Sequence, residues 1–107
     1  MSKPAAKPDA ALEKLGEARY RIRGELSFAV AARLHGEGQR AFFGEPARCV
    51  EVDCSGVSSA DSAGLAVLLE WLAGASVAGR SLKFVGVPEN LRAIARISEV
   101  ESLIEPG

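Results

Sequence analysis

The sequence has little of what membrane-embedded, secreted or metal-stabilised proteins need. Its 107 residues include two cysteines and one histidine, and no apolar run approaches the roughly 20 residues of a membrane-spanning helix. The first residues carry lysines but lack the continuous apolar core of a secretory signal peptide. We therefore expect a cytoplasmic protein whose stability comes from an ordinary hydrophobic core, without disulfides or metal.

The two cysteines, Cys49 and Cys54, are not placed to form a disulfide. Both fall on one predicted strand, where their spacing puts them about 16 Å apart and on opposite faces. A disulfide needs Cα atoms within about 7 Å. We interpret both cysteines as small buried hydrophobic residues.

An excess of charge of one sign is also missing. The 13 basic and 14 acidic residues give a formal net charge of -1, which provides no overall attraction to phosphate backbones. Nucleic acid is therefore not an expected partner. Since 48% of the residues are hydrophobic, a chain of this length can bury a real core as one domain.

Apolar periodicity divides the chain into a short tail and one domain. Residues 1–10 contain two prolines and no apolar pattern, so we predict a disordered N-terminal tail followed by a domain at 11–107. Leu12 and Leu15 suggest a short first strand, and period-two alternation predicts a second one at 18–22. Short apolar stretches predict further strands at 49–54, which is rich in β-branched residues, and at 81–85. Helical spacing predicts a helix capped by Ser27, one from Asp61 or Ser62 to Gly79, and one starting at Pro88.

This order of elements predicts the fold class. Strand–helix–strand crossovers need parallel neighbours in one sheet, whereas the first two strands are joined by a short turn. We expect an α/β domain with a mixed sheet of about four to five strands and crossover helices packed on it. The last helix and the C-terminus are expected to bury Leu91, Ile94, Ala95, Ile97, Val100, Leu103 and Ile104.

No pattern of catalytic or nucleotide-binding residues is evident in the sequence. It lacks the Gly-Lys-Ser/Thr ending of a phosphate loop and the Gly-x-Ser-x-Gly elbow of hydrolases. The single histidine, His35, is interpreted as a solvent-facing or partly buried helix residue. Asp53 and Asp61 are candidate ligands for a hard cation, but backbone hydrogen bonding or helix capping explains them without a metal. We expect neither enzymatic activity nor a cofactor.

Small polar residues concentrate between the third predicted strand and the helix that follows it. In open α/β sheets, ligands and partners bind at the carboxyl ends of strands. Ser62 has two interpretations there. Either it or Asp61 caps the helix, which we favour, or its hydroxyl is a phosphorylation site beside helix N–H groups that tolerate negative charge.

The predicted helix after Asp61 has two apolar stripes. Leu65, Leu68, Leu69 and Leu72 form a broad core-facing stripe, and Val67, Trp71, Ala75 and Ala78 form a second one beside it. Trp71 either fills the core against the first helix or belongs, with Val67, to a face that a partner covers.

The residues Asp53 and Asp61-Ser62-Ala63-Gly64-Leu65 resemble the mark of the STAS family: a strand ending in Asp, a short loop, then Asp-Ser/Thr-x-Gly-Leu opening a helix. The resemblance extends from about Leu12 to Ile104. It includes Gly24-Glu25-Leu26 and Gly86-Val87-Pro88.

Two branches of this family are candidates. Ala63 departs from the anti-sigma factor antagonists, which usually carry Ser or Thr there. Residues 61–72 and 91–97 look more similar to the STAS subunit of the bacterial Mla phospholipid-transport complex. That branch implies a non-enzymatic cytoplasmic subunit, peripheral on an inner-membrane transporter, which binds the ATPase of an ABC phospholipid transporter and supports outer-membrane lipid asymmetry.

The resemblance implies a protein partner, no cofactor, no nucleic acid, and membrane contact only through the transporter complex. It implies that Ser62 lies at the partner-facing surface, and the alternative is an anti-sigma factor antagonist switched by phosphorylation of Ser62. We expect the docking surface to comprise this loop and helix start, together with a candidate partner face on the helix: Ser58, Ser59, Asp61, Ser62, Ala63, Gly64, Leu65, Val67 and Trp71.

Overall fold

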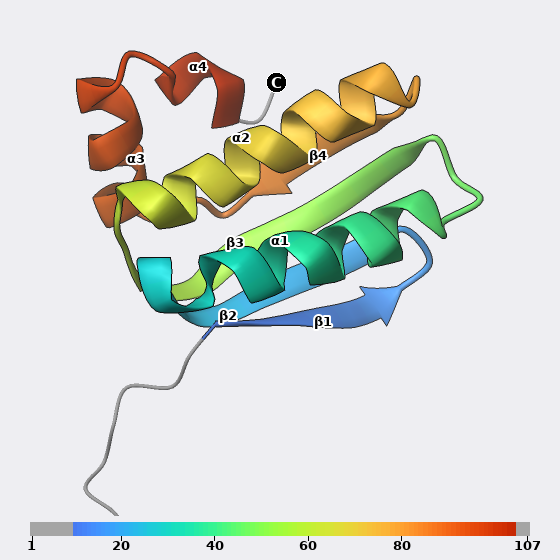
Figure 1. Ribbon diagram of the computed structural model, residues 1–107, viewed down its shortest axis with the longest axis horizontal. Helices are drawn as coiled ribbons and strands as arrows, with labels where there is room; N and C mark the ends of the chain where they lie inside the picture. Colours follow the sequence, from blue (N-terminus) through green and yellow to red (C-terminus); the bar gives the residue numbers. More distant parts are fainter. Residues whose placement is uncertain (1–9, 105–107) are drawn as a thin grey trace, which may run out of the picture.

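The computed structural model describes residues 10–104, and their strands form one four-stranded sheet in the order β1-β2-β3-β4 (Figure 1). The strand β1 pairs antiparallel with β2, whereas β2–β3 and β3–β4 are parallel. This arrangement confirms the predicted α/β class and mixed sheet. In chain order the elements are β1 (Ala11–Gly16), β2 (Arg19–Leu26), α1 (Phe28–Phe43), β3 (Cys49–Ala60), α2 (Ser62–Val77), β4 (Ser81–Val85), α3 (Glu89–Ile97) and α4 (Glu101–Ile104).

The predicted tail lies mostly outside the described residues. Only Ala10 of that tail is described, and it belongs to the domain. It is fully buried, and its N–H donates a hydrogen bond to the carbonyl of Glu25 over 3.1 Å.

The two long helices α1 and α2 run side by side over one face of the sheet (Figure 1). Alternation along β2 directs Tyr20 and Ile22 beneath the helices, while the arginines that alternate with them point to the opposite face. On that opposite face Arg23 pairs with Glu13 over 2.8 Å. The sheet is therefore apolar on its helix side and charged on the other, as predicted for a half-buried strand.

The strand β3 is longer than the sequence pattern suggested. It continues past Cys54 to Ala60, because the second half of β2 pairs with it up to the partners Leu26 and Ala60. Two register shifts in the β2–β3 pairing accommodate the extra residues of β3, and Val57 remains buried. The prediction of a loop at Ser58 and Ser59 is therefore wrong.

The contact between α1 and α2 centres on Trp71, which is 2% exposed. Its indole Nε1 donates to the carbonyl of His35 over 3.1 Å, and its ring meets Phe42 edge-on with centroids 5.1 Å apart. A Cβ added at Gly38 would overlap the indole ring, so the helices can approach this closely only with glycine there. Trp71 is therefore a core residue.

The prediction of an exposed partner face at Val67 and Trp71 is wrong, since Val67 is only 4% exposed. The physical reason is that α2 packs on the sheet and also against α1 beside it, and so it buries two stripes rather than one. The core interpretation of Trp71 holds.

Three other side chains depart from their predicted burial. Cys54 is fully buried, but Cys49 is exposed because strand alternation places it on the face that no helix covers. Ile97 is 84% exposed and Leu103 is 56% exposed. The chain leaves α3 at Ile97 and turns through Glu99 at φ 61 into the short helix α4, which buries Ile104 instead.

Two glycines on α1 test the close contact between the helices. We expect Gly38→Ala to lower the free energy of unfolding by about 1–3 kcal/mol, because the new methyl group overlaps Trp71. The matched control Gly36→Ala meets only the flexible end of Arg40 and should raise stability by up to about 1 kcal/mol. Urea unfolding of both variants checks this, and a Gly38→Ala variant as stable as Gly36→Ala would contradict the packing.

Candidate functional site

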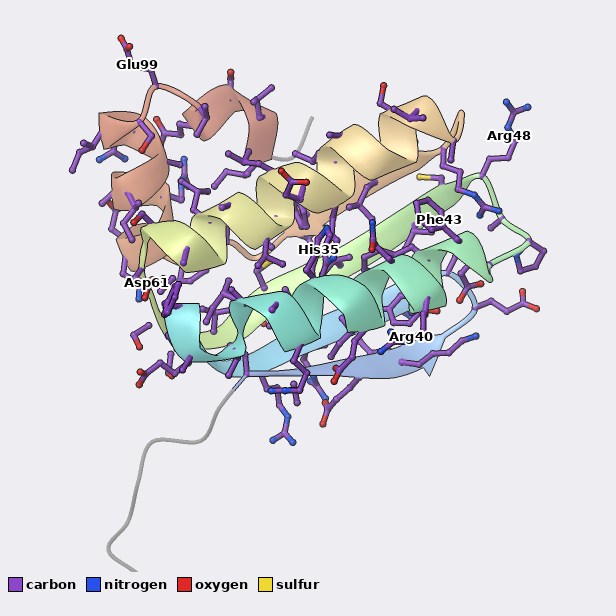
Figure 2. The ribbon with its side chains drawn as sticks, viewed as in Figure 1. His35, Arg40, Phe43, Arg48, Asp61 and Glu99 are labelled. Carbon is purple, nitrogen blue, oxygen red and sulfur yellow. The ribbon has the colours of Figure 1, made fainter. Side chains whose placement is uncertain are left out.

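One carboxylate joins the starts of the two long helices. Asp61 is the N-cap of α2, where its Oδ1 accepts a hydrogen bond from the Gly64 N–H over 2.9 Å. Its Oδ2 accepts from the N–H of Phe28, the first residue of α1, also over 2.9 Å. Figure 2 shows Asp61 where these two helices begin. The side chain therefore holds both N-termini together.

The environment of Asp61 favours its charged form. Burial opposes ionisation, but the hydrogen bonds from backbone N–H groups, foremost those of Phe28 and Gly64, hold the pKa of the carboxylate below the ordinary aspartate value. The partial positive charge of the helix N-termini acts in the same direction.

The cap of α2 is thus Asp61 rather than Ser62. Ser62 is the first residue of the helix, and it is exposed. Ser27 occupies the cap position of α1 as predicted, but its side chain makes no capping hydrogen bond. Asp61, 33 residues from Phe28 in the sequence, accepts the hydrogen bond of the Phe28 N–H instead.

The remaining predicted site residues divide between surface and core. Ser58 is exposed and Ser59 is half-buried, both at the end of β3. Gly64 and Leu65 are buried, and a Cβ at Gly64 would overlap the carbonyl of Leu26, so this turn of α2 packs directly on β2. Gly64 and Leu65 therefore position the site, while Ser62 and Ala63 face outward.

A mostly apolar groove of about 330 Å³ lies between α1 and α2 and includes Ala63, the neighbour of Ser62. We call it the α1–α2 groove. Phe28, at one side of it, is 80% exposed, which is unusual for so large an apolar side chain. The groove is lined by Phe28, Ala31, Ala32, His35, Ala63, Ala66, Val67 and Glu70.

Sequence reasoning missed most of this groove. Val67, which lines the groove, was among the predicted site residues. Phe28 was not, because nothing in the apolar sequence at the start of α1 marks it as a surface residue. The available signal was the alanine spacing of the two helices, at 31–32 and at 63 and 66, which removes side-chain bulk between them. That signal acquires meaning only once the helices are known to lie side by side.

A second, more polar cavity of about 550 Å³ lies near the C-terminal end of α1. There the buried Glu45 accepts hydrogen bonds from the Tyr20 hydroxyl over 2.5 Å and the Ala18 N–H over 3.2 Å, and it pairs with Lys14 over 3.1 Å. Burial and then the Glu45 hydrogen bond raise the pKa of Tyr20 to about 12. These contacts satisfy the buried acid and fasten the α1–β3 connection, so we assign them a structural role.

The arrangement at the α2 start is suited to binding rather than to metal chemistry. Asp53 accepts a hydrogen bond from the Ser55 N–H over 2.9 Å, which lowers its pKa, and Asp61 is engaged by two helix starts. Within residues 10–104, no group of three or more His, Cys, Asp or Glu side chains could hold a metal ion. None of the described helices has the length and hydrophobicity to cross a bilayer.

A mixed sheet with two helices on one face and an Asp-Ser-x-Gly-Leu helix start defines a STAS-type domain. Residues 11–105 match the family described as "Mlab, STAS domain". The chain belongs to this family, which confirms the resemblance seen in the sequence.

The fold is similar to that of the anti-sigma factor antagonist SpoIIAA in its unphosphorylated form. The TM-score is 0.70 with 16% sequence identity, over 92% of this chain and 87% of that chain. At this identity the likeness concerns the fold. No curated protein sequence matches the chain.

Replacing Asp61 tests its double capping role. Asp61→Ala removes the caps of α1 and α2 together, so we expect a loss of roughly 2 kcal/mol, at about 1 kcal/mol per cap. Asp61→Asn keeps an acceptor oxygen but has no charge, so its free energy of unfolding should lie between those of Asp61→Ala and the parent. Urea unfolding at neutral pH gives the ranking.

Acid unfolding provides the matching pH test. The folded pKa of Asp61 is lower than the ordinary value of 3.8, so its stabilisation is complete above that value and is lost as the pH falls below it. In that range the stability of the parent should fall more steeply than that of Asp61→Asn. Equal pH dependence of the two proteins would show that the carboxylate charge contributes nothing.

Proposed function

We propose that this chain is a non-enzymatic accessory subunit that binds the ATPase of an ABC phospholipid transporter and stabilises or regulates it. In this role the chain lies at the cytoplasmic side of an inner-membrane complex that maintains outer-membrane lipid asymmetry. The family description and the similarity of residues 61–72 and 91–97 to the transport branch support the choice of partner.

The observation that carries the proposal is the α1–α2 groove, which reaches Ala63, the neighbour of the exposed Ser62 at the start of α2. Exposed apolar surface around a concave site is typical of protein docking. Phe28 supplies an aromatic contact at the groove. Because Asp61 fixes both helix starts, the groove is already shaped before a partner arrives, which lowers the entropy cost of binding.

The second candidate is an anti-sigma factor antagonist switched by phosphorylation of Ser62. Two observations favour it: the fold is similar to that of SpoIIAA, and Ser62 is exposed at a helix N-terminus. However, Asp61 already accepts hydrogen bonds from two N–H groups at this position. This Asp belongs to the mark of the whole family and does not separate the two branches, but Ala63 stands where the antagonists usually carry Ser or Thr. The departure at Ala63 favours the transport subunit.

A charge at Ser62 separates docking from folding. We expect Ser62→Asp to abolish co-purification with the transporter ATPase encoded in the same genome, because an unpaired charge buried at an interface costs several kcal/mol. Ser62→Ala should still bind, since Ser62 makes no cap. Each variant is co-expressed with the ATPase and also melted alone.

The melting temperatures of all variants should stay close to that of the parent, because position 62 is exposed and an acidic residue suits a helix start. Ser102→Asp, at an exposed serine on α4, is the control and should bind normally. Undiminished binding by Ser62→Asp would exclude the start of α2 from the docking surface. Failure of the parent itself to bind would contradict the proposed function.

A further inference from the structure

The α1–α2 groove contains a polar atom that the domain leaves without a partner. The Nε2 atom of His35 is buried, and it has no hydrogen-bond partner among residues 10–104. An imidazole nitrogen is either a donor or an acceptor in every protonation state, so leaving it unpaired away from water is unfavourable. Figure 2 shows His35 between α1 and α2, and its backbone carbonyl is held by the Trp71 indole.

An acidic side chain accompanies this histidine. Glu70 is an exposed residue of α2 that lines the same groove. Within the described part of the chain it forms neither an ion pair nor a hydrogen bond, unlike Glu13, Glu37, Glu45 and Glu101. The groove thus combines apolar walls with one unpaired hydrogen-bonding atom and one unpaired negative charge.

On the basis of the proposed function, we propose that the α1–α2 groove receives an amphipathic helix of the ATPase. An apolar side chain of that helix fills the space beside Phe28 and Ala66. A lysine or arginine of the same helix pairs with Glu70. A polar group of the partner makes a hydrogen bond to His35 Nε2, for which the imidazole ring turns outward, because this atom is buried in the unbound chain. Charge complementarity selects a basic partner segment, and the groove between two parallel ridges of side chains suits a helix.

This inference assigns the two polar groups different effects. The Glu70 pair lies at an exposed position, so it contributes to orientation and the rate of association, and salt should weaken it. The His35 hydrogen bond forms at a buried atom, so its loss should mainly speed dissociation.

Calorimetric titration of the purified ATPase into the purified chain tests the inference. Glu70→Lys should weaken binding at least tenfold, because it places a positive charge against the basic partner segment. The control Glu17→Lys makes the same charge change at an exposed residue of the β1–β2 turn and should bind within about twofold of the parent. Raising the salt concentration should weaken ATPase binding by the parent more than binding by Glu70→Gln.

His35→Phe provides the second arm of the test. It keeps an aromatic ring and makes the groove more apolar. If the groove bound its partner by hydrophobic contacts alone, His35→Phe would therefore bind the ATPase as tightly as the parent or more tightly. If a partner group bonds to Nε2, binding should instead weaken at least fivefold. Circular dichroism checks that each variant is folded. If His35→Phe does not fold, Glu70→Lys still tests the inference, because it changes an exposed residue.

The outcomes distinguish this inference from the function on which it rests. Absence of binding by the parent overturns the proposed ATPase partner and, with it, the helix assigned to the groove. Binding by the parent that neither Glu70→Lys nor His35→Phe weakens leaves the ATPase as partner but overturns the groove assignment.

Discussion

The shared cap at Asp61 is the contact on which the candidate site depends. Its two carboxylate oxygens accept hydrogen bonds from Phe28 in α1 and from Gly64 in α2. Helix starts normally satisfy their free N–H groups separately, with local side chains or water. Here one residue serves two helices that are far apart in sequence, so the geometry of one helix start determines that of the other.

The interior contact between α1 and α2 keeps that geometry along the helices. Trp71 lies against Gly38 and bonds to the backbone of His35, which places the His35 ring at the groove. Burial of Trp71 also explains why α2 is apolar on more than one side. What remains outside is a small surface of alanines, Phe28, Ser62 and Glu70, and the binding proposals concern this surface.

Local patterns were enough to predict the class of the fold and the start of α2. The end of that helix was also predictable: Gly79 has φ 70, and the Arg80 N–H bonds to the Ala75 carbonyl, as expected for a glycine terminator. The extension of β3 to Ala60 was not predictable, because Ser58 and Ser59 join the sheet only through long-range pairing with β2. The hydrogen bond from the Phe28 N–H to Asp61 was not predictable either, because it joins residues 33 positions apart in the sequence. The exposure of Ile97 depends on where the chain turns after α3, which the helical pattern of apolar residues does not contain.

We propose that the helix starts of this STAS domain form the surface that contacts a transporter ATPase. Hydrogen–deuterium exchange of the chain, alone and bound to the ATPase, tests this claim most directly, because it locates protection along the sequence without altering any residue. We expect added protection at residues 28–35 and 62–70, with exchange unchanged on the charged face of the sheet. Protection confined to that sheet face or to α3 and α4, with none at the two helix starts, would contradict it.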